Sequence, residues 1–312
     1  MRIAIVGTGG VGGYLGGRLA QAGEEVVFIA RGQHLQAMRD HGLRVDSING
    51  DFILDPVQAT DNPAEVGPVD VVAVAVKGWQ VPDAAQSMQP LVGDQTFIVP
   101  FLNGIEAADQ LAEVYGPEQV VHGFCHIVSF IAGPGHIKHS GVDPIFSFGE
   151  ADNQRSPRIE RLYQALDRAE GIAPQIPPDI QAAVWSKFLL ISPWSCIGSL
   201  TQAPVGAWRE VPETRELWQQ LMGEIVTLAQ AHQINLTEAK IERTTAFVDQ
   251  LTPQLTASMQ RDVLAGKPSE METQVGAVIR LAQEARLEVP AYRFIYACLR
   301  PLELRARGDL SF

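Results

Sequence analysis

The sequence predicts an α/β fold: an N-terminal Rossmann-type, doubly wound, mostly parallel sheet, followed by an all-helical C-terminal domain. Two patterns predict it. Residues 2–123 alternate short β-branched runs with segments of helical period, as repeated βαβ units do, whereas residues 180–305 have helical period almost throughout. Between them, Pro174, Pro177 and Pro178 indicate a linker. We therefore predict one domain over residues 1–177 and a second over 178–312.

The first unit contains the pattern Gly-x-Gly-x-x-Gly. An apolar run over 2–6 precedes the turn, a helical pattern follows it, and residues 25–30 form a second strand at βαβ spacing. Gly7 permits the tight turn, Gly9 lets the backbone approach a pyrophosphate, and Gly12 lets the helix pack on the strand. The helix N-terminus then faces the phosphates. This context predicts a dinucleotide-binding site that includes the whole turn, Gly7, Thr8, Gly9, Gly10, Val11 and Gly12.

Arg31 indicates which dinucleotide is bound. An NAD-preferring site usually has an acidic residue at the end of the second strand, but this chain has Ala30 and then Arg31. A guanidinium suits a 2′-phosphate, which favours NADPH over NADH. The alternative is an exposed arginine at a strand end.

The remaining elements follow the same alternation. In the first domain we expect a helix at 33–39, a hairpin over 43–54 with its turn at 49–51, strands at 69–76, 96–102, 119–123 and 172–176, and helices at 82–88, 105–115 and 158–166. In the second we expect helices at 180–192, 214–233, 237–249, 258–264, 270–285 and 290–305. Lys77 and Asn103 follow predicted strands, as Arg31 does. Because ligands bind beyond the carboxyl ends of such strands, these three residues form a candidate site.

Composition excludes several other classes of protein. The 312 residues have a formal net charge of −12, which argues against a nucleic-acid partner. The three cysteines lie far apart, and no carboxylate or cysteine cluster accompanies the seven histidines, so we expect neither a disulfide framework nor a metal site. No run reaches the ~18 apolar residues of a membrane helix. We expect a protein of the reducing cytoplasm, and the apolar helical stripes could serve a homodimer or only the domain's own core.

Five motifs in order resemble the ketopantoate reductases (2-dehydropantoate 2-reductases) along nearly the whole chain. They are Gly7 to Gly12, Val76-Lys77-Gly78-Trp79-Gln80, Leu102-Asn103-Gly104, Trp185-Ser186-Lys187, and Ser258 to Asp262 followed by Lys267-Pro268-Ser269-Glu270. The resemblance implies a Rossmann domain joined to a helical domain, NADPH as the cofactor, and a 2-keto acid as the substrate.

The resemblance also implies roles for particular residues. Lys187 would be the catalytic lysine, and Glu270 its partner near the nicotinamide. Asn103 would contact cofactor and substrate, Lys77 the cofactor, and Ser258 the substrate. The chemistry suits them, because hydride delivery to a ketone leaves an alkoxide that a lysine can stabilise and protonate.

Each of these residues also has a purely structural interpretation. Lys187 could extend to solvent from an apolar helix. Glu270 could be a first-turn acid of a helix in which Ser269 and Glu272 have capping-box spacing. Asn103 with Gly104 could form a plain turn, and Lys77 could be a solvated strand-end lysine.

Several substrate positions depart from the family pattern. One and two turns past Lys187, where the family usually has Asn, stand Ile191 and Ser195; a third Asn is replaced by Val205, and another by Val275. We therefore predict an NADPH-dependent reductase of a 2-keto acid, either 2-dehydropantoate or a less polar relative, with Ile191 and Ser195 at the substrate. The alternative is a non-catalytic NADPH-binding sensor, which would have no need of Lys187 and Glu270.

Overall fold

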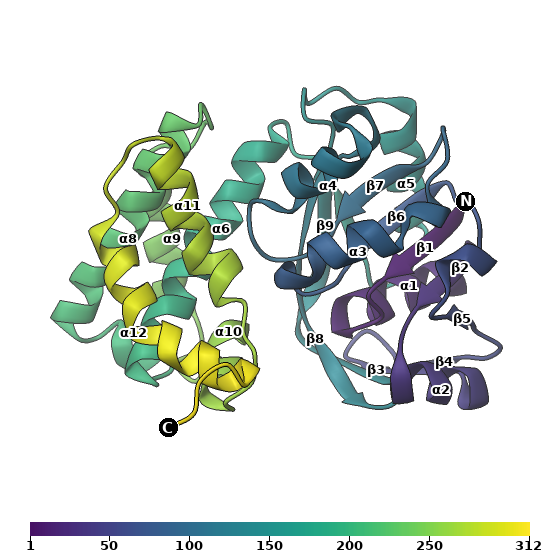
Figure 1. The fold of residues 1–312 in the computed structure, drawn as a ribbon, viewed down its shortest axis with the longest axis horizontal. Helices are drawn as coiled ribbons and strands as arrows, with labels where there is room; N and C mark the ends of the chain where they lie inside the picture. The colour runs from purple at the N-terminus through teal and green to yellow at the C-terminus, as the bar shows by residue number, and fades with distance from the viewer. The chain divides into compact units, whose positions relative to one another are not determined.

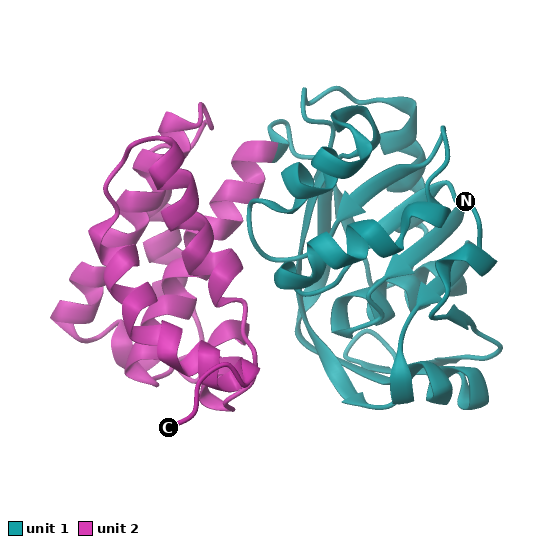
Figure 2. Ribbon diagram, viewed as in Figure 1, with its two compact units in different colours: residues 1–180 teal, residues 181–312 magenta.

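The computed structural model describes all 312 residues, and the chain divides into two compact units, Met1–Ile180 and Gln181–Phe312 (Figures 1 and 2). The sequence had placed the division between residues 177 and 178. Helix α6, Ile180–Thr201, begins where the first unit ends. No helix in either unit is both long enough and apolar enough to cross a membrane.

Unit 1 is built on a five-stranded, entirely parallel sheet, here called sheet A. Its order is β5-β2-β1-β6-β7, so the strand order reverses between β1 and β6, as in the doubly wound dinucleotide-binding fold. The strands are β1 Arg2–Val6, β2 Glu25–Ile29, β5 Gln58–Thr60, β6 Val71–Val74 and β7 Phe97–Pro100. The helices that connect or follow them are α1 Gly10–Gln21, α2 Gly32–His41, α3 Val81–Ser87 and α4 Ala107–Tyr115. This confirms the predicted fold class.

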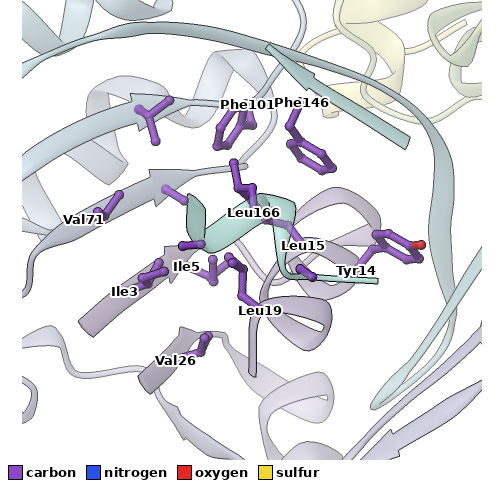
Figure 3. Close-up of a cluster of buried hydrophobic side chains, with 14 of the residues drawn as sticks. Ile3, Ile5, Tyr14, Leu15, Leu19, Val26, Val71, Phe101, Phe146 and Leu166 are labelled. Carbon is purple, nitrogen blue, oxygen red and sulfur yellow. The ribbon is translucent and has the colours of Figure 1, made fainter. Parts of the chain in front are cut away.

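Alternation along the strands gives sheet A a buried face on each side. In β1, Ile3 and Ile5 enter one apolar cluster, whereas Ala4 and Val6 enter another. The first cluster holds α1 against the sheet, with Tyr14 and its neighbours in the helix (Figure 3). The second cluster contains the apolar residues of α3 and α4. Both faces are covered by other elements, which explains the near-continuous apolar runs of the strands.

Unit 1 also contains a second, mixed sheet. The sequence predicted its hairpin over 43–54 and its strand near 172–176, but not that these strands belong to one sheet. Its order is β10-β9-β3-β4, and β8 pairs with β9 in antiparallel fashion. The long hairpin β8–β9 turns at Gly135, whose φ is +67°. The sequence offers no signal for the parallel pairings that join residues 44–47 to 136–139 and 145–147 to 173–175, because these partners lie far apart in the chain. The elements of this sheet are β3 Leu43–Ser47, β4 Phe52–Leu54, β8 His122–Gly133, β9 His136–Gly149 and β10 Ala173–Gln175, with α5 Pro157–Asp167 before β10.

Unit 2 contains only helices, as predicted. The prediction that the first helix ends at residue 192 is wrong, because α6 continues through Pro193 to Thr201. Proline in a helix costs about 3 kcal/mol, but residues 192–199 of α6 are all buried, and this packing keeps the chain helical. The other helices are α7 Val205–Trp208, α8 Pro212–Ala231, α9 Ala239–Gln250, α10 Ser258–Leu264, the π-helical turn η5 Glu272–Gly276, α11 Ala277–Glu284 and α12 Pro290–Arg307.

His34 should make the stability of unit 1 depend on pH. The backbone N–H of Gly135 donates to His34 Nδ1 at 3.0 Å, which ties α2 to the β8–β9 turn. Burial lowers the pKa of His34 below its usual 6.5, opposed in part by the backbone of Thr8. The folded state therefore favours the neutral ring, and its contribution is present above pH 6.5 and is lost as the pH falls towards the lowered pKa.

We expect the melting temperature of the wild type to fall more between pH 7.5 and pH 5 than that of the His34→Asn variant, whose Oδ1 can accept the same bond without titrating. Thermal unfolding followed by circular dichroism measures both. Parallel pH curves for the two proteins would contradict this role of His34.

Candidate functional site

The glycine turn after β1 is enclosed by the protein at some positions and open at another. Gly7 has φ +96°, and a Cβ there would lie 2.7 Å from Val76 Cγ1. A Cβ on Gly12 would lie 2.2 Å from the carbonyl oxygen of Gly7. A Cβ on Gly9 would meet nothing within 4 Å. Gly7 and Gly12 are therefore required by the fold, whereas the space beside Gly9 is available to a ligand.

Helix α1 presents an uncapped N-terminus beside that space. Its N-cap is Gly9, no side chain caps the helix, and its first turn has no acidic residue. Unsatisfied N–H groups and the positive end of a helix dipole suit a phosphate. The hydroxyl of Thr8 donates to the carbonyl of Ile29 at 3.1 Å, and Val11 packs against the apolar cluster under α1. The Thr8 hydroxyl donor is therefore used within the protein, and Val11 contributes to the packing of α1.

Arg31, Lys77 and Asn103 follow the carboxyl ends of three parallel strands of sheet A: β2, β6 and β7. Arg31 is exposed and is the N-cap of α2. Lys77 and Asn103 are half-buried, and the Lys77 ammonium lies 5.9 Å from the centre of the Trp79 ring. The topology therefore places all three at the sheet edge that carries the glycine turn.

In unit 2, Lys187, Ile191 and Ser195 are spaced by four residues on α6, so they share one face of that helix. Lys187 and Ile191 are half-buried. Ser195 is fully buried, and its hydroxyl has no hydrogen-bond partner. Val205, at the start of α7, is also fully buried. Positions 191 and 195 on α6 and position 205 on α7 are therefore less polar than three amides would make them.

Glu270 is buried immediately before the helical segment that contains η5, and its backbone is held by α12. The adjacent Ser269 donates to the Glu303 carboxylate through its N–H at 3.1 and 3.2 Å and through its hydroxyl at 2.6 Å. Arg307 pairs with the same carboxylate at 2.6 Å. Glu303 is only 3% exposed. Four hydrogen bonds on one buried carboxylate fix the chain next to Glu270.

The predicted capping box does not form. The N–H of Ser269 donates to Glu303 rather than to Glu272, and Glu272 pairs instead with Arg300 and Arg280 and accepts from the Tyr296 hydroxyl. These partners lie within 3.4 Å of its carboxylate. The spacing of Ser269 and Glu272 fits a box, but charged partners displace it: the Glu303 carboxylate accepts from the Ser269 N–H, and two arginines pair with Glu272.

Ser258 is the first residue of α10 and is half-buried. The neighbouring Gln260 anchors this helix, because its Nε2 donates to the Ala203 carbonyl at 2.9 Å and its Oε1 accepts from the N–H of Ala257. No group of three or more His, Cys, Asp or Glu side chains is arranged to hold a metal ion.

The sequence did not predict a role for two residues near Glu270, Gln274 and Glu303. Gln274 is fully buried and its Nε2 donates to the Glu270 carboxylate at 3.4 Å. Its position four residues after Glu270 was the only available signal. Glu303 lies 33 residues after Glu270 in the chain, and nothing in the sequence pairs it with Ser269.

A reversed-order parallel sheet and a glycine turn with an open approach, followed by a helical second unit, define a protein of the dinucleotide-binding Rossmann class. The chain belongs to the ketopantoate reductase family: the model "Ketopantoate reductase PanE/ApbA" matches residues 3–153, and its C-terminal counterpart matches residues 179–303. Members of this family are oxidoreductases that act on a keto group, which confirms the predicted class of enzyme.

Similar proteins span the whole chain. An uncharacterized oxidoreductase of Bacillus subtilis, YkpB, is 31% identical over 97% of this chain and 99% of its own. A 2-dehydropantoate 2-reductase of Nostoc is 28% identical over 99% of this chain and 98% of its own. The crystal structure of a ketopantoate reductase from Ralstonia eutropha superposes with a TM-score of 0.89 at 28% identity, covering 98% of this chain and all of that one.

The glycine turn allows fold and binding to be separated by mutation. Gly12→Ala forces a Cβ onto a backbone oxygen, so we expect the free energy of unfolding to fall by about 1–3 kcal/mol, as overpacking does. Gly9→Ala meets no protein atom. We expect it to keep the wild-type stability and to weaken dinucleotide binding about tenfold or more, roughly 1.4 kcal/mol.

Urea unfolding and fluorescence titration with the nicotinamide dinucleotide measure the two effects. Gly223→Ala, in α8 with open space around it, is the matched control and should leave binding unchanged. Wild-type affinity of the Gly9→Ala variant would show that no ligand approaches this turn.

Proposed function

We propose that the protein is an NADPH-dependent reductase of a 2-keto acid, converting 2-dehydropantoate to pantoate or reducing a less polar relative. Membership of the ketopantoate reductase family over both units supports this most directly. The open space at Gly9 and the uncapped α1 fit the pyrophosphate of a dinucleotide. The same membership disfavours a non-catalytic sensor.

Arg31 supports NADPH rather than NADH. It is exposed just beyond β2, at the sheet edge that carries the glycine turn, and no acidic residue stands at the end of that strand to bind a ribose 2′-hydroxyl. Its guanidinium can bind a 2′-phosphate through two parallel hydrogen bonds. Lys77 and Asn103 would contact the rest of the cofactor, together with Glu270.

The reduction needs a hydride, a proton and a stabilised oxyanion. The bound cofactor supplies the hydride to the keto carbon. Lys187 donates hydrogen bonds to the keto oxygen, stabilises the negative charge that develops there, and transfers a proton to it, so that the ketone becomes an alcohol. Glu270 orients the Lys187 ammonium, and Asn103 fixes the substrate without adding charge.

The substrate position favours a keto acid with fewer polar groups than 2-dehydropantoate. Ile191 and Val205 replace amides of the family pattern, and Ser195 is a shorter donor. A site that hydrogen-bonds a hydroxyl can reject the analogue without one by up to ~10⁴-fold, so loss of these amides relaxes that requirement. Ser258 remains as a polar contact for the substrate.

Substitution of Lys187 tests the catalytic assignment. We expect Lys187→Ala to lower kcat by about 10²–10⁴-fold, the usual contribution of a positioned acid, while NADPH affinity stays within a few fold. Absorbance at 340 nm with NADPH and a panel of 2-keto acids, 2-dehydropantoate included, measures turnover. If the wild type oxidises NADPH with none of these acids, the substrate class is wrong; turnover that survives the substitution would refute the role of Lys187.

Substitution of Arg31 tests the cofactor. Because a hydrogen bond to a charged group contributes about 1.5–3 kcal/mol, Arg31→Ala should weaken NADPH binding about 10–100-fold. Binding of NADH, which has no 2′-phosphate, should change little. Fluorescence titration with both cofactors measures the ratio, and equal losses would exclude a 2′-phosphate contact.

A further inference from the structure

Gln274 lies in the π-helical turn η5, one turn after Glu270, and is completely buried. Its backbone N–H donates to the carbonyl of Glu270 at 2.9 Å, and its side-chain Nε2 donates to Oε2 of the same residue at 3.4 Å. Its Oε1 is buried without a hydrogen-bond partner. Turns of this type often occur at functional sites.

A second buried glutamine in the same unit shows what a purely structural one does. Gln260 is also completely buried, and the backbone of Ala203 and of Ala257 satisfies both ends of its amide. Gln274 instead directs its donor at a carboxylate and leaves its acceptor unpaired. An unpaired buried acceptor destabilises the folded state, so the contribution of Gln274 lies in its contact with Glu270 rather than in stability.

The surrounding helices fix Gln274 in place. Its carbonyl accepts a hydrogen bond from the Ser192 hydroxyl of α6 at 2.6 Å, and that hydroxyl also lies 2.8 Å from the Tyr292 hydroxyl of α12. On the other side of Glu270, Ser269 is held by Glu303 of the same α12. The residue before Glu270 is thus anchored to α12, and both the carbonyl and the carboxylate of Glu270 accept from Gln274.

We propose that Gln274 is a positioning residue that holds the Glu270 carboxylate in the orientation needed to act on Lys187. This inference rests on the proposed function, in which Glu270 orients the catalytic lysine. The chain has Val275 where the family pattern usually has Asn, and its side-chain amide stands one residue earlier. Gln274 therefore supplies an amide to this segment from a different face of the helix.

Other titratable groups lie around Gln274 on its own turn and on the helices packed against it. Glu272, in the same turn, is paired with Arg280 and Arg300. On α6 and α12, burial raises the pKa of the Cys196 thiol and of the Tyr292 hydroxyl, so both stay neutral. A new carboxyl at position 274 would therefore repel the Glu270 carboxylate and compete with it for the ammonium that the proposed function places there, that of Lys187.

The test compares Gln274→Met, which keeps the size and removes the donor, with Gln274→Glu, which sets a carboxyl against Glu270. We expect Gln274→Met to lower kcat about tenfold with little change in KM, because orientation is lost and binding is not. Trp218→Phe is the matched control: it removes the hydrogen bond to Thr245 between α8 and α9, and should leave kcat unchanged.

The pH profile separates positioning from packing. Two facing carboxylates repel, so at pH 8 Gln274→Glu should be less active than Gln274→Met. As the pH falls towards about 5, the carboxyl at position 274 and that of Glu270 share a proton, which restores a hydrogen bond between them. The ratio of kcat in Gln274→Glu to kcat in the wild type should therefore rise. The ratio for Gln274→Met should stay flat. The melting temperature of Gln274→Glu, relative to Gln274→Met, should likewise rise as the pH falls.

Wild-type kcat in Gln274→Met, or a pH-independent ratio for Gln274→Glu, would overturn the positioning role. Failure of the proposed function has a different signature, because the wild type itself would then reduce no 2-keto acid. In that case the melting temperatures still decide whether Gln274 faces Glu270. A difference in melting temperature between Gln274→Glu and Gln274→Met that does not change with pH would overturn the inference.

Discussion

The close approach of backbone to backbone at the start of α1 is the constraint on which unit 1 depends. A Cβ at position 12 would lie 2.2 Å from the carbonyl oxygen of Gly7, and one at position 10 would lie 2.4 Å from that of Ser129. Because no side chain fits at either place, α1 can lie against β1 on one side and β8 on the other. Its N-terminus then faces the sheet edge where β2, β6 and β7 end, and Arg31, Lys77 and Asn103 follow these strands.

Local sequence patterns were sufficient to predict most of the fold. The parallel strands of sheet A are buried on both faces, so each appears in the sequence as a short apolar run, and the glycine turn marked the first of them. The second sheet depends on pairings between distant segments, such as Arg44 with His136, for which the sequence offers no signal. The extent of α6 was missed for a related reason, because the packing that keeps Pro193 in a helix comes from other helices.

The residues of the candidate site also differ in how far the sequence predicts their surroundings. Motif residues such as Lys77 and Asn103 could be placed because each follows a recognisable strand. The surroundings of Glu270 could not, because Glu303 reaches Ser269 from a helix later in the chain and Glu272 prefers arginines to a local cap. Propensity identifies which residues begin a helix, but long-range charge decides where their side chains point.

The hairpin β8–β9 has a consequence for how the protein folds. Ser129 closes over Gly10, Ile137 packs on Gly13, and the His139 ring lies 4.7 Å from that of Tyr14, so the first helix is completed by residues more than a hundred positions later in the chain. Contacts of such sequence separation form slowly, because long loops must close first. The glycine turn and the first helix therefore complete their packing only once the chain through the β8–β9 hairpin is available, although they precede that hairpin by more than a hundred residues.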